Sequence, residues 1–253
     1  MKTIAISFLL YTCCSALAQP AYTDSARVGL LEKIVAIQAQ FRELKSTQDF
    51  LMQDSMQYDP DNYSEYQSLL KPSAWAVTGI DSSLSRLGIT AYTMGRVPAV
   101  PQGYIVLSSE PTFYSLATAK SGAIFLLRGF WKNDFATMVK QEFGNRINRS
   151  LAISLGVFYI SNVVYPLGMG IVDTSTSESQ LAKFKVKVHY PTARVDEKGD
   201  FHVSICDVQP KSNVTALIGE FVERRFVFGK NGSFECLHPK ILGTFTGSPQ
   251  VDK

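Results

Sequence analysis

Residues 201–206 read Phe-His-Val-Ser-Ile-Cys, and residues 221–228 read Phe-Val-Glu-Arg-Arg-Phe-Val-Phe. In the first stretch apolar and polar side chains alternate, which is the pattern of a strand with one buried face. The second stretch is followed at 229–232 by Gly-Lys-Asn-Gly, whose Asn-Gly pair is favoured in tight hairpin turns. Together with residues 233–238, the two stretches predict an antiparallel sheet.

The alternating pattern extends toward the N-terminus of these strands. Residues 183–190 read Lys-Phe-Lys-Val-Lys-Val-His-Tyr, and Asp-Glu-Lys-Gly at 196–199 predicts a turn into residue 201. The polar residues 173–180 have the composition of a linker. We therefore expect an antiparallel β module over residues 181–247, separated from the preceding region by this linker.

A mainly helical region is predicted before the linker, over residues 19–175. Apolar side chains recur every three or four residues over 24–56 and again over 73–94, and residues 111–148 also favour a helix. The predicted fold class is α+β, with a helical N-terminal and middle region followed by a small antiparallel β-sheet module. We interpret the apolar stripe of the first helix as a surface for a protein partner or for self-association; it consists of Leu30, Ile34, Ile37, Phe41, Leu44 and Leu51.

Residues 151–172 form a run of twenty-two residues without a charge, long enough to cross a bilayer. Asn162, Pro166, Gly168 and Gly170 interrupt the run, and its β-branched residues suit buried strands equally well. We favour a buried apolar segment, with membrane insertion as the alternative.

The N-terminus has the three parts of a secretory signal peptide. Lys2 provides a positive start, residues 4–11 are almost entirely apolar, and Ala16-Leu17-Ala18 is a small-x-small cleavage site. We expect residues 1–18 to be removed after Ala18 and the protein to be secreted or periplasmic. The formal net charge of +3 is too small to indicate a nucleic-acid partner.

Cleavage after Ala18 would leave two of the four cysteines, Cys206 and Cys236. Two cysteines in an oxidising compartment most often pair. A disulfide closing this loop of roughly 30 residues would stabilise the fold by about 3–4 kcal/mol on the chain-entropy model. We therefore predict a Cys206–Cys236 disulfide.

All three histidines, His189, His202 and His238, lie in the predicted β module. Residues two or four apart in a strand share a face, so His202 and Cys206, and likewise Cys236 and His238, could converge on a zinc or copper ion. The spacings match no zinc pattern, and a disulfide would remove two ligands. We therefore expect no metal and no cofactor, and keep His202 and His238 as the alternative ligands.

No common catalytic motif occurs in the sequence: there is no His-Glu-x-x-His, Gly-x-Ser-x-Gly or Cys-x-x-Cys. The lysines at 183, 185 and 187 and the Arg224-Arg225 pair are interpreted as solvated residues that oppose edge-to-edge aggregation, rather than as an anion site. We expect an exported, non-enzymatic interaction or structural protein. The alternatives are a protein inserted in a membrane through 151–172 and a secreted hydrolase whose acid or base is among Glu110, Asp134, Glu142 and His202.

Overall fold

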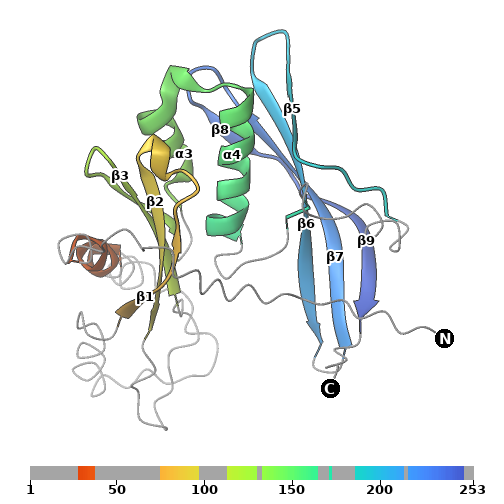
Figure 1. Ribbon diagram of the computed structural model, residues 1–253, viewed down its shortest axis with the longest axis horizontal. Helices are drawn as coiled ribbons and strands as arrows, with labels where there is room; N and C mark the ends of the chain where they lie inside the picture. The colour runs from red at the N-terminus through yellow and green to blue at the C-terminus, as the bar shows by residue number, and fades with distance from the viewer. Residues whose placement is uncertain are drawn as a thin grey trace, which may run out of the picture. The chain divides into compact units, whose positions relative to one another are not determined.

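The computed structural model describes residues 28–37, 75–96, 113–129, 133–164, 171–172, 186–213 and 216–247. These residues contain two antiparallel sheets, of four and five strands (Figure 1). The chain divides into two compact units. One includes Asn145–Val157 and Met169–Lys253 and holds the five-stranded sheet; the other includes Thr23–Gly144 and Phe158–Gly168 and holds the four-stranded sheet.

The four-stranded sheet is a meander in which each strand pairs with the next. A 3-10 turn, η3 (Ser85–Leu87), joins its first two strands and ends at Gly88, whose φ of 87° is a conformation that glycine adopts without strain. The strands are β1 (Trp75–Asp81), β2 (Ile89–Arg96), β3 (Phe113–Ala119) and β4 (Ile124–Arg128).

The predicted helices over 73–94 and 111–148 are therefore wrong for most of their length, and so is the helical fold class. Residues 75–96 form a hairpin, and 113–128 form a second one. The apolar spacing of three and four residues arose by coincidence across two strands and a turn. Residues 89–93, Ile-Thr-Ala-Tyr-Thr, are mostly β-branched or aromatic, which favours strands. Helix is confined here to three short segments after the hairpins: α3 (Phe135–Met138), η4 (Val139–Phe143) and η5 (Gly144–Arg146).

A helix over residues 28–37 packs against the four-stranded sheet at β4. A Cβ atom on Gly29 would lie 3.1 Å from the Ile124 side chain of β4, so the helix approaches the sheet closely there. Leu30, Ile34 and Ile37 of the predicted partner-binding stripe are buried, with 0%, 1% and 9% of their surfaces exposed. Their apolar faces are thus used inside the protein, while Phe41, Leu44 and Leu51 lie outside the described residues.

The uncharged run 151–172 forms a helix rather than strands over its first part. Arg149–Tyr159 is α4 and Ile160–Val164 is a π-helical turn, η6. Asn162 donates a hydrogen bond of 2.6 Å to Asp81 in β1, and Arg128 of β4 donates to the Val164 carbonyl, so η6 packs against the four-stranded sheet. In the described part of the chain, no helix has both the length and the apolar character needed to cross a bilayer.

The five-stranded sheet contains the antiparallel strands predicted around 201–206 and 221–228, and both strands are longer than predicted. Their neighbours follow the predicted turns: Gly199 and Gly232 take φ values of 83° and 82° at the two hairpins. The strand order is β5-β6-β7-β8, and β9 also pairs with β7. The strands are β5 (Thr192–Val195), β6 (Phe201–Asn213), β7 (Ala216–Phe228), β8 (Phe234–Cys236) and β9 (Lys240–Gly247).

The inner face of this sheet packs against α4 near Gly156. A Cβ atom on Gly156 would lie 2.9 Å from Ile205, 3.2 Å from Phe226 and 3.3 Å from Val203, so the missing side chain allows the helix to approach the strands. Phe228 is fully buried on the same face. The inner face also holds a buried ion pair, in which Arg224 Nε donates to Asp207 Oδ1 over 2.9 Å.

The described part of the predicted strand 183–190 is not a strand. Residues 186–190 form no ladder with a neighbouring strand. Val186 instead lies against Gly243 of β9, and His189 reaches Ser204 of β6 before the chain enters β5. We call residues 186–190 the crossing segment, because they pass over the outer face of the sheet from β9 toward β5.

Candidate functional site

Polar side chains gather on the outer face of the five-stranded sheet, opposite α4. Antiparallel pairing places Thr192, Ser204 and Arg225 in one row across β5, β6 and β7. Directly paired residues point to the same face, so this whole row is turned away from the buried Val203 and Phe226. The adjacent rows on this face hold Arg194 with His202, and Cys206 with Glu223.

His189 of the crossing segment joins this face through a hydrogen-bonded cluster with Ser204 and Glu223. Its Nε2 lies 3.1 Å from Ser204 Oγ and 3.4 Å from Glu223 Oε1. Ser204 Oγ donates to Glu223 Oε1 over 2.8 Å. The His189 Nδ1 lies 2.7 Å from the Tyr190 carbonyl, an acceptor, so Nδ1 carries a proton. These bonds fix the crossing segment to the sheet.

The hydrogen bond from Ser204 is the largest cause of the lowered pKa of Glu223, and the contact with His189 and the positive charge of Arg225 lower this pKa further. Glu223 is therefore a carboxylate at neutral pH. The Ser204 hydroxyl has one proton, and the charged Glu223 Oε1 at 2.8 Å is a closer acceptor than His189 Nε2 at 3.1 Å, so the carboxylate is the favoured acceptor. The arrangement differs from a catalytic triad, where the histidine receives the serine proton on one nitrogen and contacts the acid through the other.

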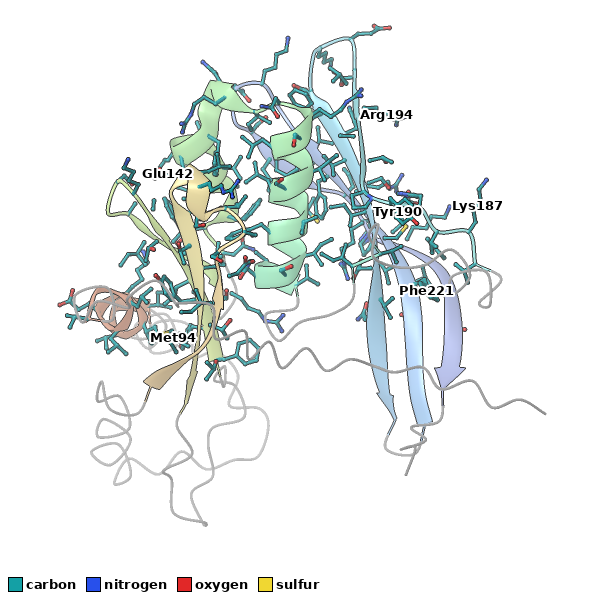
Figure 2. All side chains as sticks on the ribbon, in the orientation of Figure 1. Met94, Glu142, Lys187, Tyr190, Arg194 and Phe221 are labelled. Atoms are coloured by element: carbon teal, nitrogen blue, oxygen red, sulfur yellow. The ribbon has the colours of Figure 1, made fainter. Side chains whose placement is uncertain are left out.

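A groove of about 400 Å³ lies along this face. Arg194 and Arg225 both line it, together with Thr192, Ser204, His202 and Glu223. Among the described residues, neither guanidinium forms an ion pair. Figure 2 shows Arg194 on β5 and Tyr190 on the segment that precedes it.

The second carboxylate near the groove, Asp196, is already engaged. Its Oδ2 lies 2.9 Å from His202 Nε2, and its Oδ1 accepts the backbone N–H groups of Lys198 and Asp200. The hydrogen bond from His202 and these amides lower the pKa of Asp196. Asp196 and Glu223 therefore have hydrogen-bond partners, and Arg225 also senses the charge of Glu223, which stands two residues away on the same face of β7. Neither arginine is within ion-pair distance of a described carboxylate, so both can still contact an added anion.

The predicted Cys206–Cys236 disulfide is absent from the structure. Cys206 pairs with Glu223 and lies on the outer face, whereas Cys236 pairs with Phe226 and lies on the inner face. The two cysteines are also on strands separated by β7, roughly 10 Å apart from strand spacing alone. A disulfide requires Cα atoms within about 7 Å and converging Cβ atoms. The sheet geometry therefore separates the two thiols.

The alternative metal site is not assembled either. Among the residues that the structure describes, no group of three histidine, cysteine or acidic side chains is placed to hold a metal ion. His202 bonds to Asp196, while His238 is exposed beyond the end of β8. His189, which the sequence interpretation did not select, is the histidine placed at the centre of the outer face.

Three of the four candidate hydrolase residues are described, and each forms a hydrogen bond within its own unit. Asp134 accepts the Leu126 backbone N–H over 2.9 Å and so anchors the start of α3 to β4. Glu142 accepts a hydrogen bond from Ser121 on the turn between β3 and β4. Both belong to the unit of the four-stranded sheet, whereas His202 belongs to the other unit. Glu110 lies outside the described residues.

The sequence interpretation missed Ser204, Glu223 and Arg194, and it grouped Arg224 with Arg225. Neighbouring residues in a strand point to opposite faces, so Arg224 joins the buried pair with Asp207 while Arg225 lines the groove. Alternation alone indicates which of these side chains share a face within one strand. The register between strands, which brings them into one cluster, is set by the turns and the packing.

Comparisons of the chain with protein-family models, with curated proteins and with solved structures returned no match.

Proposed function

We propose that this is an exported, non-enzymatic binding protein that holds an anionic ligand in the groove on the outer face of the five-stranded sheet. One observation carries the proposal: Arg194 and Arg225 line the same groove, and neither guanidinium is within ion-pair distance of a described carboxylate. The export part rests on the signal-peptide pattern of residues 1–18.

The residue types of the groove suit anion binding. A guanidinium offers several N–H donors in a plane and can bind a carboxylate or a phosphate with two parallel hydrogen bonds. Thr192 adds a hydroxyl group beside Arg194 on β5, whereas the hydroxyl proton of Ser204 is already donated to Glu223. The nearest carboxylate, Glu223, accepts from Ser204 and contacts His189, which reduces its repulsion of an incoming anion.

The same geometry argues against a serine hydrolase at this site. The Ser204 hydroxyl donates to a carboxylate whose pKa is lowered, and such a carboxylate is a weak base. β6 is a central strand here, paired with β5 on one side and β7 on the other. Its backbone amides near Ser204 are therefore used in the sheet and do not form an oxyanion hole.

The binding proposal is tested by an NMR titration of the isotope-labelled exported chain with citrate. We expect shifts of the amides of residues 192–194, 202–204 and 223–225, with a dissociation constant in the millimolar range because the arginines are solvent-exposed. Arg194→Ala together with Arg225→Ala should abolish these shifts. Arg86→Ala, which removes an exposed arginine in the turn before β2, is the matched control and should leave them unchanged.

Unperturbed groove amides at high citrate concentration would refute the binding proposal. The export part is tested separately by N-terminal sequencing of the protein recovered outside the cytoplasm. Gln19 as the first residue is the expected result, and an intact Met1 would contradict it.

A further inference from the structure

We infer that the groove selects a ligand with two carboxylate groups held about 12 Å apart, as in a long linear dicarboxylate, over one with a single anionic group. This inference rests on the proposed function and adds the class of ligand to it. The argument depends on where Arg194 and Arg225 stand on the sheet.

The two arginines flank the central strand of the site on opposite sides. Arg194 pairs with His202, and Arg225 pairs with Ser204, so the arginines lie on β5 and β7 with β6 between them. Neighbouring strands are about 4.8 Å apart and alternate residues of one strand are about 6.7 Å apart. The backbones of the two arginines are separated by two strand spacings across the sheet and by the distance between alternate residues along the strand. The diagonal between them is therefore about 12 Å.

Side chains of a sheet stand roughly perpendicular to it, so the two guanidinium groups keep approximately the separation of their backbones. A single carboxylate or phosphate would therefore contact one arginine at a time. A ligand with an anionic group at each end would contact both without bending the strands or moving either arginine far from its preferred conformation.

The residues between the two arginines suit the middle of such a ligand. Ser204 and His202 lie on β6 along the diagonal, and their polar atoms are engaged by Glu223 and Asp196. The centre of the groove therefore carries two satisfied hydrogen-bonded pairs and no unpaired cation among the described residues. A third anionic group there would lie near the charge of Glu223, so anionic groups at the two ends and an uncharged middle fit best.

The test compares sebacate, suberate and succinate with octanoate, a monocarboxylate of similar apolar character, in the same NMR titration. The extended chain of sebacate comes closest to the predicted spacing. We expect sebacate to bind about three- to fivefold more tightly than octanoate, which is the gain expected from a second exposed ion pair. Succinate, which is too short to reach both arginines, should bind like octanoate.

Single variants determine whether both arginines are used by one ligand. Arg194→Ala and Arg225→Ala should each reduce the affinity for sebacate to that for octanoate, while Arg86→Ala should not change it. Equal affinities for sebacate and octanoate, or tighter binding of inorganic phosphate than of sebacate, would overturn the spacing inference while leaving anion binding intact. No binding of any of these anions would instead overturn the proposed function.

Discussion

The buried ion pair between Asp207 and Arg224 provides the strongest test of how the five-stranded sheet is stabilised. The Asp207 side chain is fully buried, the Arg224 side chain is 11% exposed, and Arg224 Nε donates to Asp207 Oδ1 over 2.9 Å. Arg224→Met removes the positive charge but keeps most of the side-chain volume. The Asp207 carboxylate then remains in the interior and loses the hydrogen bond and the positive charge of Arg224.

The expected cost is large because a charge in a low-dielectric interior is poorly solvated. Two unit charges at contact distance attract by about 4 kcal/mol at an effective dielectric constant of 20. Removing one partner of a buried pair costs about 3–5 kcal/mol in proteins generally. We therefore expect Arg224→Met to reduce the opening free energy of β6 and β7 by about 4 kcal/mol, which is close to a thousandfold in the opening equilibrium.

Amide hydrogen exchange is the appropriate assay, because it reports the stability of these strands separately from the other unit. Arg86→Met, at an exposed position, is the control and should change the exchange of β6 and β7 very little. Adding Asp207→Asn to Arg224→Met removes the buried negative charge and should recover at least half of the loss. A change of less than about 1 kcal/mol for Arg224→Met would refute the argument from burial.

Three further predictions concern the outer face and the contact with α4. Ser204→Ala should raise the pKa of Glu223, measured by carbon NMR titration, because it removes the largest contribution to the lowered pKa. A lowered carboxyl pKa stabilises the fold at pH values above the unfolded-state pKa, and this stabilisation is lost as the pH falls through the folded-state pKa. The variant should therefore be less stable than the parent at neutral pH and equally stable at strongly acidic pH, and equal stability at both pH values would contradict this. Gly156→Leu should destabilise the unit of the five-stranded sheet by about 1–3 kcal/mol in hydrogen exchange, because a Cβ atom at this position would lie 2.9 Å from Ile205 and a leucine must displace the Ile205 side chain. An unchanged exchange rate would show that α4 does not approach the sheet this closely. In a thiol-labelling experiment on a chain that begins at Gln19, Cys236 should react under native conditions and Cys206 only after unfolding, because Cys206 is fully buried and burial raises its pKa. A total of zero reactive thiols after unfolding would restore the predicted disulfide.

The N-terminal half shows where sequence periodicity is a poor guide. Val77, Ile80, Leu84, Leu87, Ala91 and Met94 are spaced as on a helix, yet they belong to β1, the η3 turn and β2. Spacing of three and four residues describes a helix only if the backbone continues without a turn. Gly88, with its positive φ, breaks that continuity, and the β-branched residues on either side are the local signal that favoured strands.

The candidate site shows a second limit of prediction from the sequence. The residue types of residues 201–206 and 221–228 were sufficient to predict antiparallel strands, and the two turn sequences were sufficient to place the hairpins. The pairing of Ser204 with Thr192 and Arg225 depends on the register of three strands, and the approach of His189 depends on a segment that pairs with none of them. Neither is encoded in the spacing within one strand.

The sequence by itself therefore determined the two long strands of the C-terminal sheet and the turns beside them, and indicated the apolar character of the segment 151–172. Those features follow from short-range properties: alternation of apolar residues, the backbone preference of Asn-Gly, and the cost of exposing a long apolar run to water. Only the tertiary structure decided that the middle of the chain is a sheet, that Cys206 and Cys236 lie on opposite faces, and that Arg194 and Arg225 line one groove. The reason is physical, because register, face and strand order are set by contacts between residues far apart in the chain.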